Sequence, residues 1–203
     1  KMSREAQLAL VEAQRRYSTN PEDWAAAREP LIEFLATPQV DPIPETLYMM
    51  LGQFWYADEA NEKHIEEANK VFRMGYKAFP LSESFLLNLA ITTYDLAGME
   101  EDEDAQRKLF AETATLFEKF YDLSAEKEIK YLEYAAQTSY LAEKLAEARR
   151  IYVRMIGLWE EPQDLWMQQI IGICQAMEDI KEEEKYIRMA LDYFPKEKKY
   201  WNL

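Results

Sequence analysis

The sequence of 203 residues predicts an all-α protein in which antiparallel helix pairs repeat along the chain and wind into a right-handed superhelix. The composition favours helices, because there are only five glycines and eight prolines, and 48% of the residues are apolar against 31% charged. No stretch shows the alternation of apolar and polar residues that is typical of strands. Small and apolar residues also recur at fixed offsets. We therefore expect residues 1–203 to form one array of about five helix pairs, with the start of a sixth at the C-terminus.

The repeat is clearest in two stretches. In residues 51–80, Gly52 and Trp55 precede small and aromatic residues at the offsets 0, 4, 7 and 12, which are Ala68, Phe72, Gly75 and Pro80. Further on, Ala136 and Ala148 stand twelve residues apart without an insertion. This spacing resembles that of the tetratricopeptide-repeat (TPR) family, whose unit is a helix–turn–helix of about 34 residues. The resemblance covers residues 5–195 and implies a solenoid in which each helix pair contacts only its neighbours.

A register follows from the small residue of each first helix, position 8 of the family's template. We place this position on one residue in each of the five repeats: Gln14, Gly52, Ala90, Ala136 and Ile171. Every interval exceeds 34 residues, so the repeats carry insertions. Because the template keeps position 8 small, we expect Gly52 and Ala136 to lie where the first helix closely approaches its neighbour.

In the first repeat, Asn20 and Pro21 predict the start of the second helix, with Asn20 as the N-cap and Pro21 at the first helical position. Ala26 is assigned to the template's alanine of the second helix. Pro30 lies inside this helix, where it removes a backbone donor, so we expect a kink there.

The second repeat follows an extended linker, residues 38–44, in which three prolines disfavour helix. Its insertion falls between its two helices, around residues 57–64. The third repeat is separated into its helices by the acidic stretch 98–104, which we expect to be a solvated, mobile loop without partners for its charges.

The fourth repeat keeps the template spacing, and the fifth places Ile170, Ile171 and Cys174 in its first helix. Trp201 then falls six residues after Pro195, where a further first helix would begin. We therefore expect the sequence to be a piece of a longer chain. Residues 192–203 also resemble the repeats of bacterial TPR proteins associated with TonB-type energy-transducing systems.

The TPR resemblance implies a function: in this family the first helices line a concave groove that binds protein or peptide ligands. Template position 12 in repeats two to four is a tyrosine, at Tyr56, Tyr94 and Tyr140. The other groove positions that we assign to partner binding are apolar or amide side chains: Met49, Gln53, Leu87, Ile91 and Gln137. The tyrosines would alternatively pack between repeats. The clamp of Lys and Asn side chains with which one branch of the family grips a C-terminal carboxylate is missing.

Other classes of function find little support. The net charge of −14 disfavours a nucleic-acid partner, and no apolar run approaches the length of a membrane-spanning helix. No catalytic, nucleotide-binding or metal motif is present, so we expect neither an enzyme nor a cofactor. His64, the single histidine, is expected to be exposed at the start of a second helix, and Arg149 and Arg150 are interpreted as scattered helix-end cations.

Two hypotheses therefore remain. The first is a non-enzymatic scaffold that binds a protein or peptide in the groove. The alternative is a structural module that forms homo-oligomers through an exposed terminal face containing Tyr200 and Trp201. The sequence is compatible with either a bacterial cytoplasmic or a periplasmic location, because a single cysteine excludes an internal disulfide in both.

Overall fold

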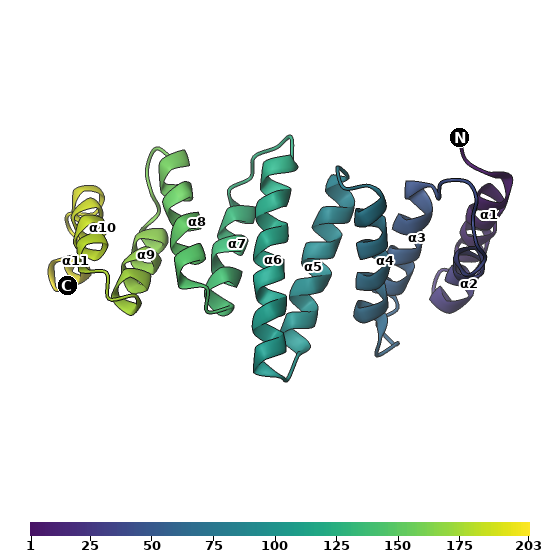
Figure 1. Ribbon diagram of the computed structural model, residues 1–203, viewed down its shortest axis with the longest axis horizontal. Helices are drawn as coiled ribbons and strands as arrows, with labels where there is room; N and C mark the ends of the chain where they lie inside the picture. The colour runs from purple at the N-terminus through teal and green to yellow at the C-terminus, as the bar shows by residue number, and fades with distance from the viewer. The chain divides into compact units, whose positions relative to one another are not determined.

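The computed structural model describes residues 1–203 as eleven helices without a strand, which confirms the all-α prediction (Figure 1). The helices form two compact units, residues 1–99 and residues 100–203, and each is described by itself. Unit 1 holds α1 (Arg4–Thr19), α2 (Trp24–Ala36), α3 (Glu45–Ala57), α4 (His64–Ala78) and α5 (Glu83–Met99). Unit 2 holds α6 (Glu103–Leu123), α7 (Lys130–Leu141), α8 (Leu145–Leu158), α9 (Asp164–Ala176), α10 (Ile180–Tyr193) and the short α11 (Lys198–Trp201).

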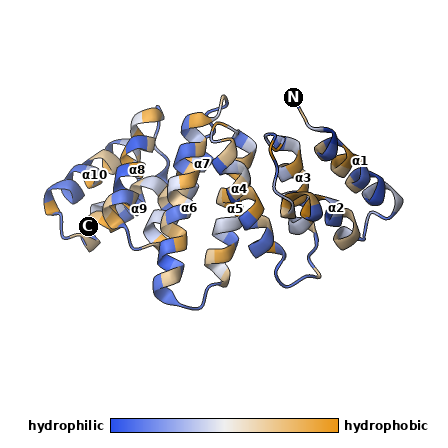
Figure 2. Ribbon diagram, turned by 45° about the vertical axis from the view of Figure 1, so that its right-hand side comes forward, coloured by the Kyte–Doolittle hydropathy of each residue, from blue (hydrophilic) through white to orange (hydrophobic).

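Within each unit, every helix packs against the helix before it and the helix after it in the chain. In unit 1 this gives the contacts α1–α2, α2–α3, α3–α4 and α4–α5, and in unit 2 the series runs from α6–α7 to α10–α11. The helices carry hydrophilic and hydrophobic residues together instead of one kind throughout (Figure 2). Each unit is therefore a layered stack of amphipathic helices, with the core between successive helices.

Small residues set how closely the helices approach. A Cβ on Gly52 of α3 would lie 2.4 Å from the ring of Phe72 in α4, and a Cβ on Gly75 would lie 2.4 Å from the ring of Phe85 in α5. The predicted close approach at Gly52 is confirmed. Ala136, its counterpart in α7, is fully buried.

The turns after α7 and α9 have the same geometry, as a repeat requires. Each contains one residue in the left-handed conformation, Glu143 with φ of 60° and Glu178 with φ of 56°. The next residues, Lys144 and Asp179, each donate their N–H at 2.9 Å to the carbonyl five residues earlier. This arrangement closes the C-terminus of the preceding helix. Because the two turns are 35 residues apart, the interval assigned between the fourth and fifth repeats holds in the backbone.

The start of the second helix in the first repeat was predicted at the wrong residue. Asn20 instead ends α1, since its N–H donates to the carbonyl of Arg16, and α2 begins only at Trp24. Asp23 is the N-cap, because its carboxylate accepts a hydrogen bond from the N–H of Ala26 at 3.0 Å. The sequence favoured Asn20 because Pro21 follows it, and proline is common at the first position of a helix.

Pro30 lies within α2, which runs on from Trp24 to Ala36. The proline has no N–H for the carbonyl of Ala26, one turn earlier. Arg16 of α1 donates to that carbonyl from its guanidinium Nη1 at 3.0 Å. The backbone acceptor that proline leaves open is therefore satisfied by a side chain of the neighbouring helix.

The acidic stretch 98–104 is not the solvated loop that we expected. Helix α5 continues to Met99 and α6 begins at Glu103, so only three residues connect them. Asp102 caps α6 by accepting the N–H of Ala105 at 2.8 Å, and Asp104 forms an ion pair with Arg107. Carboxylates are favoured in the first turn of a helix because they face its unpaired N–H groups. The charges were therefore mistaken for a loop when they mark the start of a helix.

Candidate functional site

The three predicted groove tyrosines are on the surface of the first helices. Tyr56 at the end of α3, Tyr94 in α5 and Tyr140 in α7 are 39%, 41% and 49% exposed. They are thus distinct from the buried tyrosines of the core, such as Tyr152, whose pKa burial raises to about 12. Tyr56 and Tyr94 belong to unit 1 and Tyr140 to unit 2.

Unit 1 brings Tyr56 and Tyr94 together in one open cavity of about 580 Å³, which we call the tyrosine cavity. Its lining comes from α3, α4 and α5 and the turn after α3: Tyr56, Glu59, His64, Ile65, Tyr94, Asp95, Gly98 and Met99. The hydroxyl of Tyr56 donates to Oδ2 of Asp95 at 3.1 Å and ties α3 to α5. Burial raises the pKa of Tyr56, and the negative charges of Asp95 and Glu59 raise it further.

His64 begins α4 as predicted, but it is half-buried instead of exposed. Its Nδ1 lies 2.8 Å from the backbone carbonyl of Tyr56, and its ring packs at 6.2 Å from the ring of Tyr56. The histidine therefore holds the start of α4 against the end of α3. The sequence pattern could not reveal this contact, because it crosses the insertion between the two helices.

A second cavity of unit 1, of about 480 Å³, contains two other predicted groove residues, Met49 and Gln53 of α3. We call it the aromatic cavity, because three rings line it. The ring of Tyr17 in α1 lies 5.5 Å from Trp24 and 5.6 Å from Phe54. None of these three aromatic residues was predicted from the sequence to belong to the site.

The register of the first repeat was wrong by one residue, which explains why Tyr17 was missed. Gln14, which we placed at position 8, is exposed, whereas its neighbour Ala13 is fully buried like Ala90 and Ala136. With Ala13 at position 8, Tyr17 falls at position 12. The shift in the second helix is the same, since Ala27 is fully buried and Ala26 is not.

A sequence signal for this face exists in the corrected register. Glutamine at position 9 and tyrosine at position 12 form the motif Gln-x-x-Tyr in the first, second and fourth repeats, at Gln14–Tyr17, Gln53–Tyr56 and Gln137–Tyr140. Gln14, Gln53 and Gln137 are exposed. A spacing of three residues places both side chains on one face of a helix. The motif therefore recurs as an exposed amide next to an aromatic ring.

The remaining predicted residues lie outside these two cavities. In α5, Leu87 is half-buried and Ile91 is 37% exposed, and neither lines the tyrosine cavity or the aromatic cavity. In unit 2, Gln137 and Tyr140 share the exposed side of α7 with Tyr134 and Leu141. The structure thus gathers four of the eight predicted residues, and Tyr17 with them, around two cavities of unit 1.

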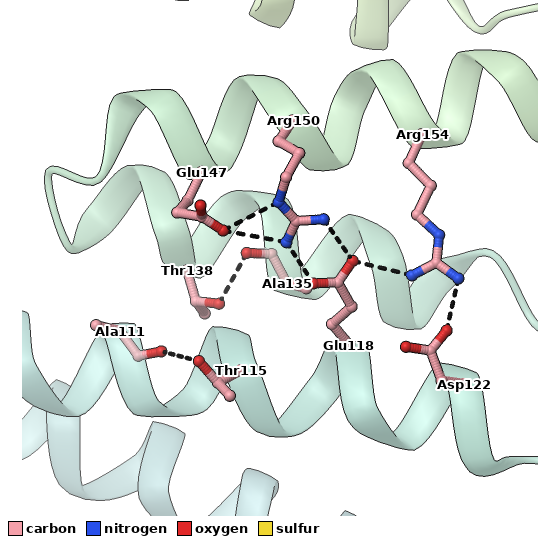
Figure 3. Close-up of polar contacts among 9 residues, drawn as sticks. All are labelled: Ala111, Thr115, Glu118, Asp122, Ala135, Thr138, Glu147, Arg150 and Arg154. Atoms are coloured by element: carbon pink, nitrogen blue, oxygen red, sulfur yellow. Dashed lines mark hydrogen bonds and ion pairs between the residues drawn. The ribbon is translucent and has the colours of Figure 1, made fainter.

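The most extensive polar cluster lies between the second helices α6 and α8 of unit 2 (Figure 3). Glu118 accepts from Arg150 at 2.5 Å and from Arg154 at 2.9 Å, while Asp122 pairs with Arg154 and Glu147 with Arg150. Burial acts to raise the pKa of Glu118, but the hydrogen bonds from the two guanidinium groups outweigh it and lower that pKa. Because every charge in the cluster is paired within it, we interpret it as structural.

The arginines of this region are not scattered helix-end cations, as they were interpreted. Arg149 pairs with Asp179 at 2.8 Å, and Arg28 in unit 1 pairs with Asp58 at 2.6 Å. In both pairs, a second helix holds the turn that lies 30 residues further on, after the next first helix. These ion pairs join successive repeats.

The remaining observations concern the cysteine, metal ligands and membrane-spanning helices. Cys174 is buried, which raises the pKa of its thiol, although the nearby Arg149 acts to lower it. No group of three or more His, Cys, Asp or Glu side chains is placed to hold a metal ion. None of the helices combines the length and apolarity needed to span a bilayer.

The prediction of an exposed terminal face is wrong for Tyr200. This residue is only 2% exposed, and its hydroxyl donates to the carboxylate of Asp164 in α9. Trp201 is 64% exposed, with its indole Nε1 donating to the carbonyl of Pro195 at 2.9 Å. The short α11 is therefore docked on unit 2 through its tyrosine.

Comparison with known proteins gave no match to a family model and no match to a curated protein. Among solved structures, TTC0263, a TPR protein of Thermus thermophilus, is 12% identical over 97% of this chain and 95% of its own, with a TM-score of 0.47. PilF of Pseudomonas aeruginosa is 18% identical over 98% of this chain and 78% of its own, with a TM-score of 0.41. A TPR protein of Parabacteroides merdae is 14% identical over 94% and 80%, with a TM-score of 0.39.

The fold itself is decided by the helix pairs, the repeated left-handed turn and the close approach at Gly52. It is a TPR-type helical repeat. The Gln-x-x-Tyr motif of this chain lies on the first helices α1, α3 and α7.

Proposed function

We propose that this helical-repeat scaffold binds a peptide segment of a protein partner on its first helices, with the tyrosines at template position 12 as anchors. One observation carries the proposal: Tyr56 and Tyr94, from successive first helices, line a single open cavity. The aromatic cavity, with Tyr17, Met49 and Gln53, lies on the same set of helices. Anchors of this kind, set in open cavities along one face, suit a peptide better than a compact small molecule.

The chemistry of the motif matches a peptide backbone. A glutamine amide both donates and accepts hydrogen bonds, so it can pair with the N–H and the C=O of a bound chain. A tyrosine ring next to it supplies contact area at a low cost in conformational entropy. Met49 adds a flexible thioether that adapts to differently shaped side chains. The face therefore combines apolar anchors with hydrogen-bonding groups.

A peptide-display selection tests the proposal. A random library is selected on the immobilised 203-residue protein, and the affinity of enriched peptides is measured by titration. The triple variant Tyr56→Ala, Tyr94→Ala, Tyr140→Ala should bind at least about 30-fold more weakly, since a tyrosine anchor is worth about 2 kcal/mol or more. Tyr193→Ala is the matched control, because Tyr193 is 47% exposed but lies on a second helix, α10.

The control variant distinguishes a specific site from nonspecific binding to exposed tyrosines. If Tyr193→Ala weakens binding as much as the triple variant does, or if the triple variant binds normally, the first helices are not the site. Circular dichroism of the triple variant should show an unchanged helix content, because all three tyrosines are exposed. Loss of helix would instead assign the tyrosines to the fold.

A further inference from the structure

We propose that the tyrosine cavity receives an arginine side chain of the bound peptide, held between the rings of Tyr56 and Tyr94 and the carboxylates of Asp95 and Glu59. The proposal rests on the peptide-binding function proposed above and names the chemistry of one of its anchors. It follows from three features of the cavity: unpaired carboxylates, aromatic walls, and two sites of the same composition elsewhere in the chain that already hold an arginine.

The carboxylates of the cavity lack a cationic partner. Asp95 is half-buried, and its carboxylate accepts a hydrogen bond from the hydroxyl of Tyr56, but it forms no ion pair. Glu59 forms none either, and no lysine or arginine lines the cavity. A carboxylate offers about four lone-pair positions, and the bond from Tyr56 uses one of them on Asp95. The cavity therefore presents negative charge next to two aromatic rings.

At two other places in the protein, an arginine is held by an aromatic ring and a carboxylate. The guanidinium of Arg28 lies 3.7 Å from the ring centroid of Trp55 and pairs with Asp58 at 2.6 Å. In unit 2, the guanidinium of Arg154 lies 5.2 Å from the ring of Tyr121 and pairs with Asp122 at 2.5 Å. Each site consists of an aromatic ring, a carboxylate and an arginine. The tyrosine cavity contains the first two of these parts and room for the third.

The surrounding charge favours a basic ligand as well. Residues 1–99 contain nine Lys and Arg against 15 Asp and Glu, a net charge of −6. The raised pKa of Tyr56, to which burial contributes most and Asp95 and Glu59 contribute next, agrees with a negative potential at the cavity wall. Such a potential attracts cationic segments and repels acidic ones.

Arginine fits this cavity better than lysine. A guanidinium is planar, stacks on aromatic rings and pairs with a carboxylate through two parallel hydrogen bonds. The ammonium of lysine is a compact, strongly hydrated charge that gains less from stacking. Two tyrosine rings beside a carboxylate therefore select for the guanidinium.

The test uses blocked tripeptides as probes and the full 203-residue protein. Acetyl-Gly-Arg-Gly-amide is titrated while the methyl NMR signals of Ile65 and Met99, which line the cavity, are followed. We expect saturable shifts with a dissociation constant on the order of 1 mM, the affinity of a single anchor. The neutral isostere with citrulline in place of arginine, and the lysine tripeptide, should both bind at least about tenfold more weakly. The buried Met155 and Met167 of unit 2 serve as reporters that should not shift.

Two variants assign the effect to the cavity. Asp95→Asn removes the charge but keeps an oxygen for the hydroxyl of Tyr56, and it should weaken the arginine probe about tenfold. Glu33→Gln removes the same charge from an exposed position of α2 outside the cavity lining and should change little.

Three results would overturn the inference: no shift at Ile65 and Met99, equal binding of the citrulline or lysine probe, or equal losses in the two variants. If these occur while selected peptides still bind through the tyrosines, the arginine site is wrong and the proposed function stands. If no peptide binds either, both are wrong.

Discussion

A side chain has no room at position 52, because the ring of Phe72 occupies the space in which a Cβ on Gly52 would lie. Phe72 is only 1% exposed, so its ring cannot turn away into solvent. Gly172 in α9 is also inside a helix, but nothing lies within 4 Å of a Cβ built there. Both glycines therefore have the same low helix propensity, but only Gly52 lies in a tightly packed contact.

Alanine should separate these two terms. Gly172→Ala should raise the free energy of unfolding by about 0.5–1 kcal/mol, the helix-propensity difference between the two residues. Gly52→Ala gains the same propensity but overpacks the contact with Phe72 at a cost of about 1–3 kcal/mol, so a net loss is expected. Urea unfolding of both variants checks this. A gain in stability for Gly52→Ala would show that α3 and α4 can separate at no cost.

Arg16 replaces the hydrogen bond that Pro30 cannot make, and a double-mutant cycle can isolate this role. Arg16→Met should destabilise the natural protein more than it destabilises a Pro30→Ala variant, in which a new N–H can reach the carbonyl of Ala26. The expected coupling is about 0.5–1.5 kcal/mol. Because Arg16 also contacts Glu12 and Glu29 in both backgrounds, those losses cancel in the cycle. A coupling of zero would mean that the carbonyl is satisfied by water.

At the scale of elements, the N-terminus of α6 shows how charge is used. Asp102 accepts a backbone hydrogen bond, whereas its neighbour Glu101 is exposed and forms no hydrogen bond or ion pair. Within the acidic stretch, we therefore expect Asp102, and not Glu101, to stabilise the start of α6.

Asp102→Ala should cost about 1 kcal/mol, the value of a lost N-cap. Glu101→Ala, which removes the same charge one residue earlier, should stay within about 0.5 kcal/mol of the natural protein. Thermal unfolding of the two variants makes the comparison. Equal effects would indicate that general charge repulsion and not capping governs this segment.

The pair of helices α6 and α8 should lose stability in acid through Glu118. Its pKa is lowered in the folded protein, so the carboxylate stabilises the fold above about pH 4.3, its unfolded pKa, and this contribution disappears as the pH falls through the lower folded value. Glu118→Gln should therefore cost about 1–2 kcal/mol at pH 7, between the values of exposed and buried pairs. The deficit should shrink below about pH 4, because the natural protein also loses the charge there.

Chemical unfolding at pH 7 and pH 3 measures this difference. Glu147→Gln is the matched control, since Glu147 contacts Arg150 from a position that is 58% exposed and should contribute less than about 0.5 kcal/mol. A deficit of Glu118→Gln that is independent of pH would contradict the assigned role of its charge.

At the scale of the whole molecule, the sequence was sufficient for the fold class, since small residues at contacts such as Gly52 are a local requirement that repeats. The register of the first repeat could not be predicted, because it depends on which side of α1, that of Ala13 or that of Gln14, packs against α2. Ion pairs between successive repeats could not be predicted from the sequence either. Arg28 and Asp58 lie 30 residues apart, and only the packing of successive helices brings them together.

The lining of the candidate cavities was predictable to a similar extent. Tyr56 and Tyr94 were assigned from template positions and do line one cavity. The charge of their partner Asp95 next to two rings was not predicted, because it depends on how α3 and α5 pack. Tyr17 was missed as a site residue for the register error already described, and Trp24 was missed because it begins the second helix α2, where no groove position was assigned.

If the first helices bind the peptide, site-directed photo-crosslinking should locate it there. A photoreactive benzoylphenylalanine is placed at Gln53 or Gln137 on first helices, and at Met74 or Val153, which are 44% and 42% exposed on the second helices α4 and α8. A selected peptide should crosslink on the first helix of at least one unit, at residue 53 or at residue 137, and not at residues 74 and 153. Crosslinking at the second helices alone would contradict the claim.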